Sequence, residues 1–249
     1  TIRLLDDEQA MTQIPELYRR IGAHRPGMIA RPAGWWRRNH DRWIRRGGLT
    51  VAVHRGQDGD DGFVVYRTTY LGSFEDPERG VALEVRDLHG TSPAAVTELW
   101  RYLISVDLVG EIRAPGRPAD EPVDAMLTDS RACRVRAFGD ELWLRLLDVP
   151  GALAARTFLP APPVVLEVAD AQLPENSGRY RVGAGAVERT DDDAELSMDV
   201  QTLAMIYLGE WRPGMLADLG RVRVADAAAV ARADELFHTP TRPWCGTGF

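Results

Sequence analysis

The sequence predicts a mixed α/β unit followed by a smaller α+β unit. In the first half of the chain a hairpin is followed by strand, helix and strand, the order of a mixed sheet with helices. The composition changes over residues 148–163, where a proline-rich stretch is typical of a stiff linker. Beyond it, short strand-like segments precede helices, which favours an α+β arrangement.

The first unit is expected to open with two helices. Residues 8–21 carry apolar side chains at helical spacing. Residues 34–46 form the second helix, in which Trp35 and Trp36 stand among arginines. Three strands are expected next, at residues 49–54, 63–71 and 81–88. The first two are joined as a hairpin by a loop rich in turn-forming residues.

A helix over residues 93–104 is the clearest element of the chain. Ser92 is its expected N-cap and Pro93 occupies its first position. Its apolar residues form one stripe that can cover a sheet. The remaining predicted elements of this unit are a strand at 109–114, a short helix at 123–127, and strands at 131–138 and 141–147.

The second unit is predicted to contain short strands and at least two helices. Residues 200–208 are apolar nearly all round, which is typical of a buried helix, with Asp199 as its cap and Gly209 as its stop. A final helix begins at Asp226. The strands are expected near 164–169, 179–183, 185–189 and 194–198.

Composition excludes several classes of function. A net charge of −7 argues against a general nucleic-acid surface and favours cationic ligands. No apolar run reaches the ~20 residues of a membrane span, and no signal peptide is visible. Two cysteines provide no disulfide framework, which favours the cytoplasm. The five histidines are scattered, so no metal site is expected.

The last seven residues, 243–249, form an unusual chain end. They carry no charged side chain, and they contain two aromatic residues and two glycines, at which the backbone can bend. Because burying a Trp or Phe stabilises by roughly 1.5–3 kcal/mol, such a tail is expected to dock. If Phe249 docks, its α-carboxylate becomes an anion at a fixed place. The alternative is that the tail only covers an apolar surface.

The adjacent pair Trp35 and Trp36 is the other candidate for a site. Successive helical residues point about 100° apart, so only one of the two can face the core. The other needs a partner surface, which is either a ligand site or a packing contact with another domain or subunit.

Four segments resemble the Eis (enhanced intracellular survival) family of acetyltransferases, in order and over essentially the whole chain. They are 127–131 (LTDSR), 141–156 (ELWLRLLDVPGALAAR), 203–209 (LAMIYLG) and 244–249 (WCGTGF). The resemblance implies a degenerate GNAT-like mixed-sheet domain over residues 1–155. It also implies a sterol-carrier-protein-like α+β domain over 156–249, ending in a catalytic tail.

The resemblance further implies a reaction and its residues. Family members form hexamers, and some move acetyl from acetyl-CoA to aminoglycosides or other amines. The C-terminal carboxylate is their general base, which identifies Phe249 as the catalytic residue. Trp35, or else Trp36, would line the amine-substrate pocket, and Asp129 is a further candidate for the same pocket.

One segment departs from the family pattern. A GNAT domain holds the CoA pyrophosphate with backbone N–H groups of a glycine-rich loop before a helix. Here residues 87–94 contain one glycine, no arginine and Pro93, which lacks an N–H. The chain also begins, by the same resemblance, where the family's second domain begins. We therefore expect acetyl-CoA to be bound by an N-terminal GNAT domain that is not in this chain.

Two other functions stay open. A sterol-carrier-like unit can enclose a lipid in an apolar tunnel, although ordinary core packing also explains the apolar helix at 200–208. Alternatively, both domains serve only as scaffold and as an oligomerisation surface.

Overall fold

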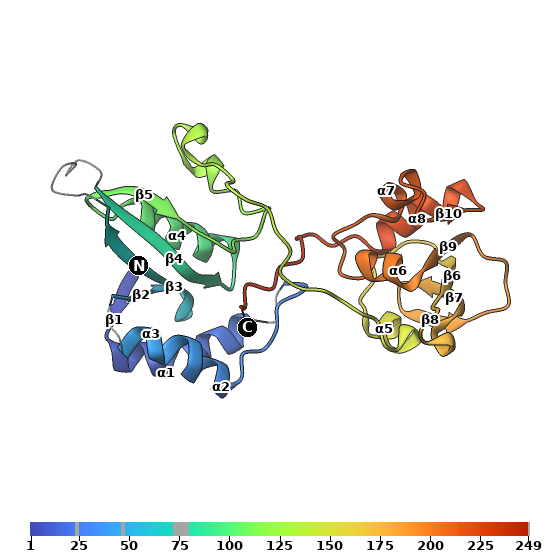
Figure 1. The fold of residues 1–249 in the computed structure, drawn as a ribbon, viewed down its shortest axis with the longest axis horizontal. Helices are drawn as coiled ribbons and strands as arrows, with labels where there is room; N and C mark the ends of the chain where they lie inside the picture. Colours follow the sequence, from blue (N-terminus) through green and yellow to red (C-terminus); the bar gives the residue numbers. More distant parts are fainter. Residues whose placement is uncertain (23–24, 46–47, 72–79, 249) are drawn as a thin grey trace. The chain divides into compact units, whose positions relative to one another are not determined.

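The computed structural model describes residues 1–22, 25–45, 48–71 and 80–248. It divides the chain into two compact units (Figure 1). The first contains Thr1–Glu141 together with the tail from Trp244 onward, and the second contains Leu142–Pro243. The predicted domains, 1–155 and 156–249, stay a prediction beside this geometric division.

The first unit is built on one mixed sheet in the order β1-β2-β3-β4-β5. All neighbouring pairs are antiparallel except β4 and β5, which are parallel and joined through helix α4. The predicted hairpin and the strand–helix–strand unit are confirmed, and β1 was not predicted. The strands are β1 (Ile2–Leu5), β2 (Thr50–Arg55), β3 (Asp60–Tyr70), β4 (Val81–Gly90) and β5 (Val109–Arg113).

Helices cover both faces of this sheet because the strand side chains alternate between them. On one face α1 (Asp7–Ile21), held by a capping box at Asp6, packs against Val51 and Phe63. On the other face α4 (Pro93–Ile104), capped by Ser92, packs against Val64. Figure 1 shows α1 and α3 together beside the sheet.

The predicted helix at 34–46 is divided into two α-helical turns with a π-helical turn between them. It consists of α2 (Ala33–Trp36), a π-helical turn (Arg37–Asp41) and α3 (Arg42–Arg45). The short helix predicted at 123–127 is a 3₁₀ turn, Asp124–Met126, and a second 3₁₀ turn follows at Ser130–Ala132.

The strands predicted at 131–138 and 141–147 are wrong for the structure described here. Residues 133–147 have no regular structure, and Phe138 and Trp143 are 75% and 90% exposed. Alternating apolar residues form a strand only when a neighbouring strand supplies hydrogen bonds, and among the described residues none pairs with this segment. Cys133, which lies within the first of these two segments, is exposed for the same reason.

The second unit has its own mixed sheet, in the order β10-β9-β6-β7-β8. The pair β6–β9 is parallel and the other pairs are antiparallel. The strands are β6 (Val164–Ala169), β7 (Gly178–Gly183), β8 (Ala186–Arg189), β9 (Leu196–Asp199) and β10 (Arg223–Val224). The helices are α5 (Val149–Ala155), α6 (Val200–Tyr207), α7 (Pro213–Asp218) and α8 (Ala227–Leu236), with a 3₁₀ turn at Pro174–Asn176.

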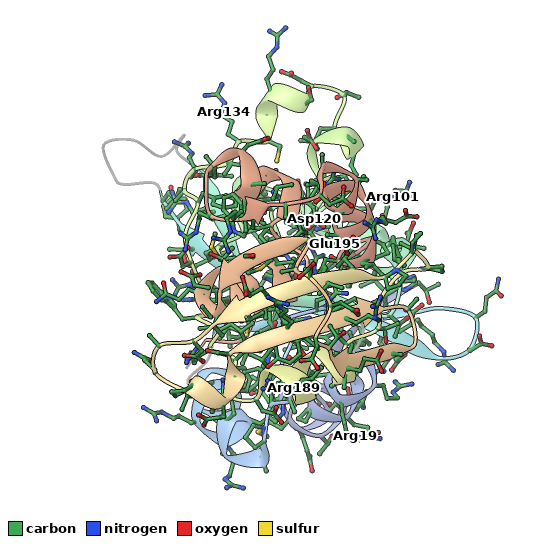
Figure 2. The ribbon with its side chains drawn as sticks, turned by 90° about the vertical axis from the view of Figure 1, so that its right-hand side faces the viewer. Arg19, Arg101, Asp120, Arg134, Arg189 and Glu195 are labelled. Atoms are coloured by element: carbon green, nitrogen blue, oxygen red, sulfur yellow. The ribbon has the colours of Figure 1, made fainter. Side chains whose placement is uncertain are left out.

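The core of this unit lies between its sheet and helices. Helix α6 is capped by Asp199 as predicted, and it buries Leu203 and Ile206 against side chains of β6 and α8. Glu195, which is labelled in Figure 2, follows β8 in the chain. It accepts hydrogen bonds from the backbone of Val165 and from Arg232. The helix predicted to be buried is therefore part of an ordinary packed core.

Candidate functional site

The tail is anchored in the first unit by Trp244. Its backbone N–H donates to the carbonyl of Pro26 at 2.9 Å, and its indole Nε1 donates to the carbonyl of Gly116 at 2.7 Å. The indole ring lies 5.1 Å from the ring of His89 and 4.9 Å from the guanidinium of Arg117. The tail is thus docked over residues 244–248, as its composition predicts.

Two glycines permit this path. Gly246 has φ +60°, a conformation that costs other residues roughly 1–2 kcal/mol, and a Cβ there would lie 2.6 Å from Cη2 of Trp244. Gly27 has φ +89°, and a Cβ there would lie 3.2 Å from the backbone N of Trp244. The tail therefore passes close to its own indole ring and to the loop after α1.

Arg31 lies between the tail and the sheet. This residue precedes α2, and its side chain is 1% exposed. Its Nε donates to the hydroxyl of Thr247 at 3.0 Å, and its Nη2 donates to the carbonyl of Gly246 at 2.5 Å. The same guanidinium lies 4.0 Å from the ring centre of Tyr18 and 4.3 Å from that of Trp35.

Asp87 balances the buried charge of Arg31. The two side chains form a bidentate pair, at 2.5 and 3.2 Å, and Asp87 also accepts from His89 at 2.7 Å. Burial disfavours the carboxylate, but the attraction of His89 and Arg31 outweighs it and holds the pKa of Asp87 well below its usual range. Burial lowers the pKa of His89, against the opposing attraction of Asp87.

The tail's own polar groups are bonded as well. Glu141 accepts a hydrogen bond from the backbone N–H of Gly246 at 3.0 Å. The hydroxyls of Thr247 and Tyr18 are 3.2 Å apart. Cys245 is buried and donates to the carbonyl of Thr247, and burial raises the pKa of its thiol. A thiol held in this neutral form is a poor nucleophile.

The two adjacent tryptophans take different roles, as their helical spacing predicts. Trp35 is half-buried, and its indole Nε1 donates to the carbonyl of Gly248 at 2.8 Å. Trp36 is buried in the core, packs edge-on against Tyr18, and donates to the carbonyl of Arg31 at 3.1 Å. Trp35 therefore lies beside the tail, whereas Trp36 supports the cluster from behind.

Of the other predicted site residues, Asp129 is not brought to this cluster. Asp129 is exposed and caps the 3₁₀ turn at Ser130–Ala132 through the backbone N–H of Arg131. Phe249 lies outside the described residues. Conversely, Arg31, Asp87 and His89 surround the tail but were not identified from the sequence as partners of it, because nothing in a sequence marks which distant charges become buried together.

A cavity of about 220 Å³ lies beside the docked tail. Its walls include charged side chains and tail residues: Asp87, Arg117, Glu141, Trp244, Gly246 and Gly248. Arg86 lines the same space, so two carboxylates, two guanidinium groups and an indole ring face it, and the walls can hold a small polar molecule.

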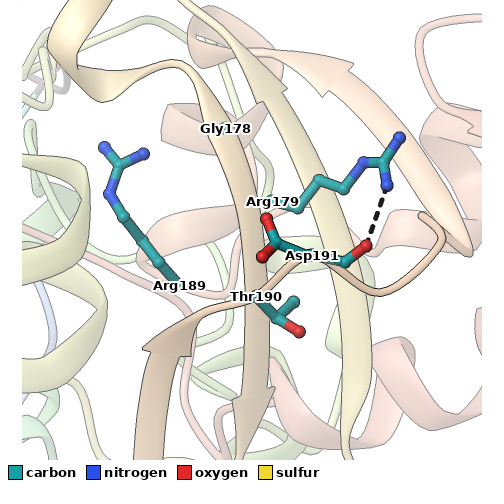
Figure 3. A pocket seen from close by; sticks show the side chains of 5 residues that line it. All are labelled: Gly178, Arg179, Arg189, Thr190 and Asp191. Atoms are coloured by element: carbon teal, nitrogen blue, oxygen red, sulfur yellow. Dashed lines mark hydrogen bonds between the residues drawn. The ribbon is translucent and has the colours of Figure 1, made fainter.

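A second cavity, of about 400 Å³, lies in the second unit (Figure 3). Its two guanidinium groups are already bonded to backbone carbonyls. Arg179 donates to Asp191 and Asp192, and Arg189 donates to Ser177 and Glu175. These cations stabilise the turns around the cavity, which makes it a poor candidate for an anion site.

Within the described ranges, no group of acidic, histidine or cysteine side chains is arranged to hold a metal ion. Among the same residues, no helix has the length and apolarity needed to cross a membrane.

Two protein-family models match consecutive parts of the chain. The acetyltransferase (GNAT) domain matches residues 27–146, and the sterol carrier protein domain matches residues 149–246. Together with the mixed sheets, these matches define a GNAT acetyltransferase domain joined to a sterol carrier protein domain, which confirms the predicted fold class.

The relatives narrow this class to one family. An uncharacterized N-acetyltransferase of Streptomyces griseus is 36% identical over 98% of this chain and 61% of its own length. N-acetyltransferase Eis of Mycobacterium tuberculosis is 29% identical over 95% and 57%. The crystal structure of Eis1 from Mycobacterium abscessus superposes with a TM-score of 0.88 at 36% identity, covering 100% of this chain and 62% of that one. The chain belongs to the Eis-type family of N-acetyltransferases, and it spans about three-fifths of the length of these relatives.

Proposed function

We propose that this chain is the C-terminal part of an Eis-like enzyme that moves acetyl from acetyl-CoA to an amine, with the α-carboxylate of Phe249 as general base. The docked tail carries this proposal. Trp244, Gly246, Thr247 and Gly248 are each hydrogen-bonded within the first unit, so the tail is held up to the residue before Phe249. Trp35, bonded to Gly248, is the proposed wall of the amine pocket, and Asp129 stays a weaker candidate.

The proposed reaction is direct transfer. The carboxylate, directly or through water, takes one proton from the substrate ammonium. The freed amine attacks the thioester carbonyl of acetyl-CoA, so that a C–N bond forms and the C–S bond breaks. The extra proton on the acylated nitrogen passes to the departing CoA sulfur, which leaves as the thiol. A carboxylate with an ordinary pKa near ~3.5 is a weak base at neutral pH, so this role requires surroundings that raise the pKa.

We propose an amine that carries several positive charges, such as an aminoglycoside or a polyamine. The net charge of −7 favours such acceptors electrostatically. Acetyl-CoA itself is then a co-substrate, as it is for GNAT acetyltransferases in general.

We propose that a separate, N-terminal GNAT domain binds acetyl-CoA. The junction of β4 and α4 supports this because three of its amide groups are already engaged and a fourth residue has no N–H. The N–H of Thr91 donates to Asp61, and those of Ala95 and Val96 donate to Ser92, while Pro93 has none. Calorimetric titration of this chain with acetyl-CoA is expected to show no binding, and micromolar affinity would refute this part of the proposal.

The base is tested in the full-length enzyme by deleting Phe249 or by extending the chain a few residues past it. Both changes are expected to abolish acetyl transfer to an amine, since each removes the carboxylate from its place. Transfer at a near wild-type rate in either variant would refute the carboxylate as base.

Assembly and location complete the proposal. We propose a cytoplasmic homo-hexamer, because family resemblance implies that assembly and the two cysteines favour a reducing compartment. Light scattering of the full-length protein tests the assembly, and a monomer would contradict it. A lipid-binding role for the second unit predicts a lipid retained in native mass spectrometry.

A further inference from the structure

We propose that Arg31 is the positioning residue that fixes the path of the tail, and that it acts as a clasp between the tail and β4. Three features of its guanidinium carry this inference: what it bonds, what it stacks on, and how completely it is buried.

The bonds of Arg31 join two parts of the chain that lie far apart in sequence. On one side, Nε and Nη2 bond the hydroxyl of Thr247 and the carbonyl of Gly246. On the other, Nη1 and Nη2 bond the two carboxylate oxygens of Asp87. Because a guanidinium is planar, these bonds fix the angle of the tail as well as its distance from the sheet.

Aromatic rings prevent the guanidinium from turning away. It lies 4.0 Å from the ring centre of Tyr18 and 4.3 Å from that of Trp35, distances at which a cation is attracted to a ring face. Trp35 in turn bonds the carbonyl of Gly248, one residue before the chain end. The same cluster therefore holds three consecutive tail residues.

Burial makes the clasp depend on arginine specifically. The side chain is 1% exposed, and that of Asp87 is 11% exposed, so water has little access to the bonds. Lysine would keep the charge but has a single nitrogen, which cannot bond Thr247, Gly246 and both oxygens of Asp87 together.

The clasp itself is a property of this chain, whereas its consequence for catalysis rests on the proposed role of the Phe249 carboxylate. Hydrogen–deuterium exchange of the tail amides of this chain measures the clasp alone. In Arg31→Lys, exchange at Trp244 and Gly246, whose amides bond Pro26 and Glu141, is expected to accelerate about tenfold or more. Exchange in β3 serves as the internal measure of folding.

Matched variants make the result decisive. Arg37→Lys changes an exposed arginine of the same segment and is expected to leave tail exchange unchanged. Thr247→Val removes the hydroxyl that Arg31 bonds, while Thr247→Ser keeps it, so only the former should accelerate tail exchange. This pair decides the question if Arg31→Lys does not fold.

Two results would overturn the clasp. One is a folded Arg31→Lys protein whose tail exchanges within about twofold of the wild-type rate, and the other is equal exchange in Thr247→Val and Thr247→Ser. In the full-length enzyme, Arg31→Lys is expected to lower kcat while leaving KM for acetyl-CoA unchanged. If tail exchange accelerates but kcat does not fall, the clasp stands and the proposed base is wrong.

Discussion

Substituting Gly246 by alanine is expected to release the docked tail. The backbone at this residue has φ +60°, which costs an alanine roughly 1–2 kcal/mol, and the new Cβ would lie 2.6 Å from Cη2 of Trp244. Forcing a methyl group into such a contact typically costs a further 1–3 kcal/mol, approximately. The indole ring cannot simply move aside, because its Nε1 is bonded to the carbonyl of Gly116.

The two costs together are at least about 2 kcal/mol, which corresponds to about a 30-fold loss in the docking equilibrium. Exchange of the Trp244 amide should accelerate by that factor, while amides of α4, which lies within the same unit, keep their rates. Gly248→Ala is the matched control, because a Cβ there meets nothing within 4 Å. Equal exchange at Trp244 in the two variants would refute the reasoning about the tail path.

Three further changes test the surroundings of the tail. Asp87→Asn leaves Arg31 buried without its counter-charge, so the free energy of unfolding, measured by urea denaturation, is expected to fall by about 3 kcal/mol or more. A loss under about 1 kcal/mol would show that the pair is not buried as described. Burial lowers the pKa of His89, so the unfolded chain takes up a proton near pH 6.5 that the folded chain does not, and stability falls as pH decreases through that value. His89→Gln should flatten this acid limb in thermal unfolding scans, and an unchanged limb would assign it to other groups. Trp35→Phe keeps an aromatic ring but removes the indole N–H that bonds the carbonyl of Gly248. Carboxypeptidase should therefore release the C-terminal residue about 2- to 10-fold faster. Release at an unchanged rate would mean that this bond does not hold the tail.

Much of the fold follows from local sequence signals. The cap at Ser92 with Pro93 and the stripe along residues 93–104 determine α4, and the same logic predicts α1 and α6. Each of these helices has its own capping residue and enough apolar surface to pack against a sheet, and both features can be recognised in the sequence of the helix itself. The hairpin of β2 and β3 is likewise encoded by a short loop between alternating segments.

The failures arise where structure depends on a distant partner. Residues 131–147 alternate as a strand should, yet among the described residues they have no neighbour to complete a ladder, so Trp143 stays exposed. The tail cluster shows the converse case. The pair Trp35 and Trp36 was identified because only one of two adjacent helical residues can face the core. Arg31 and Asp87, in contrast, are 56 positions apart and look like ordinary surface charges in the sequence.

The sequence also permits a direct test of the carboxylate itself. Cys245 is a suitable junction for native ligation, so the full-length enzyme ending at Trp244 as a thioester can be joined to a synthetic peptide covering residues 245–249. Peptides ending in a carboxylate or in a carboxamide give two enzymes that differ only in that group. General-base catalysis contributes typically 10²–10⁴-fold, so the carboxamide enzyme is expected to lose about 100-fold or more in kcat for amine acetylation while its tail stays docked. A carboxamide enzyme that acetylates amines at the rate of its carboxylate twin would contradict the proposed role of Phe249.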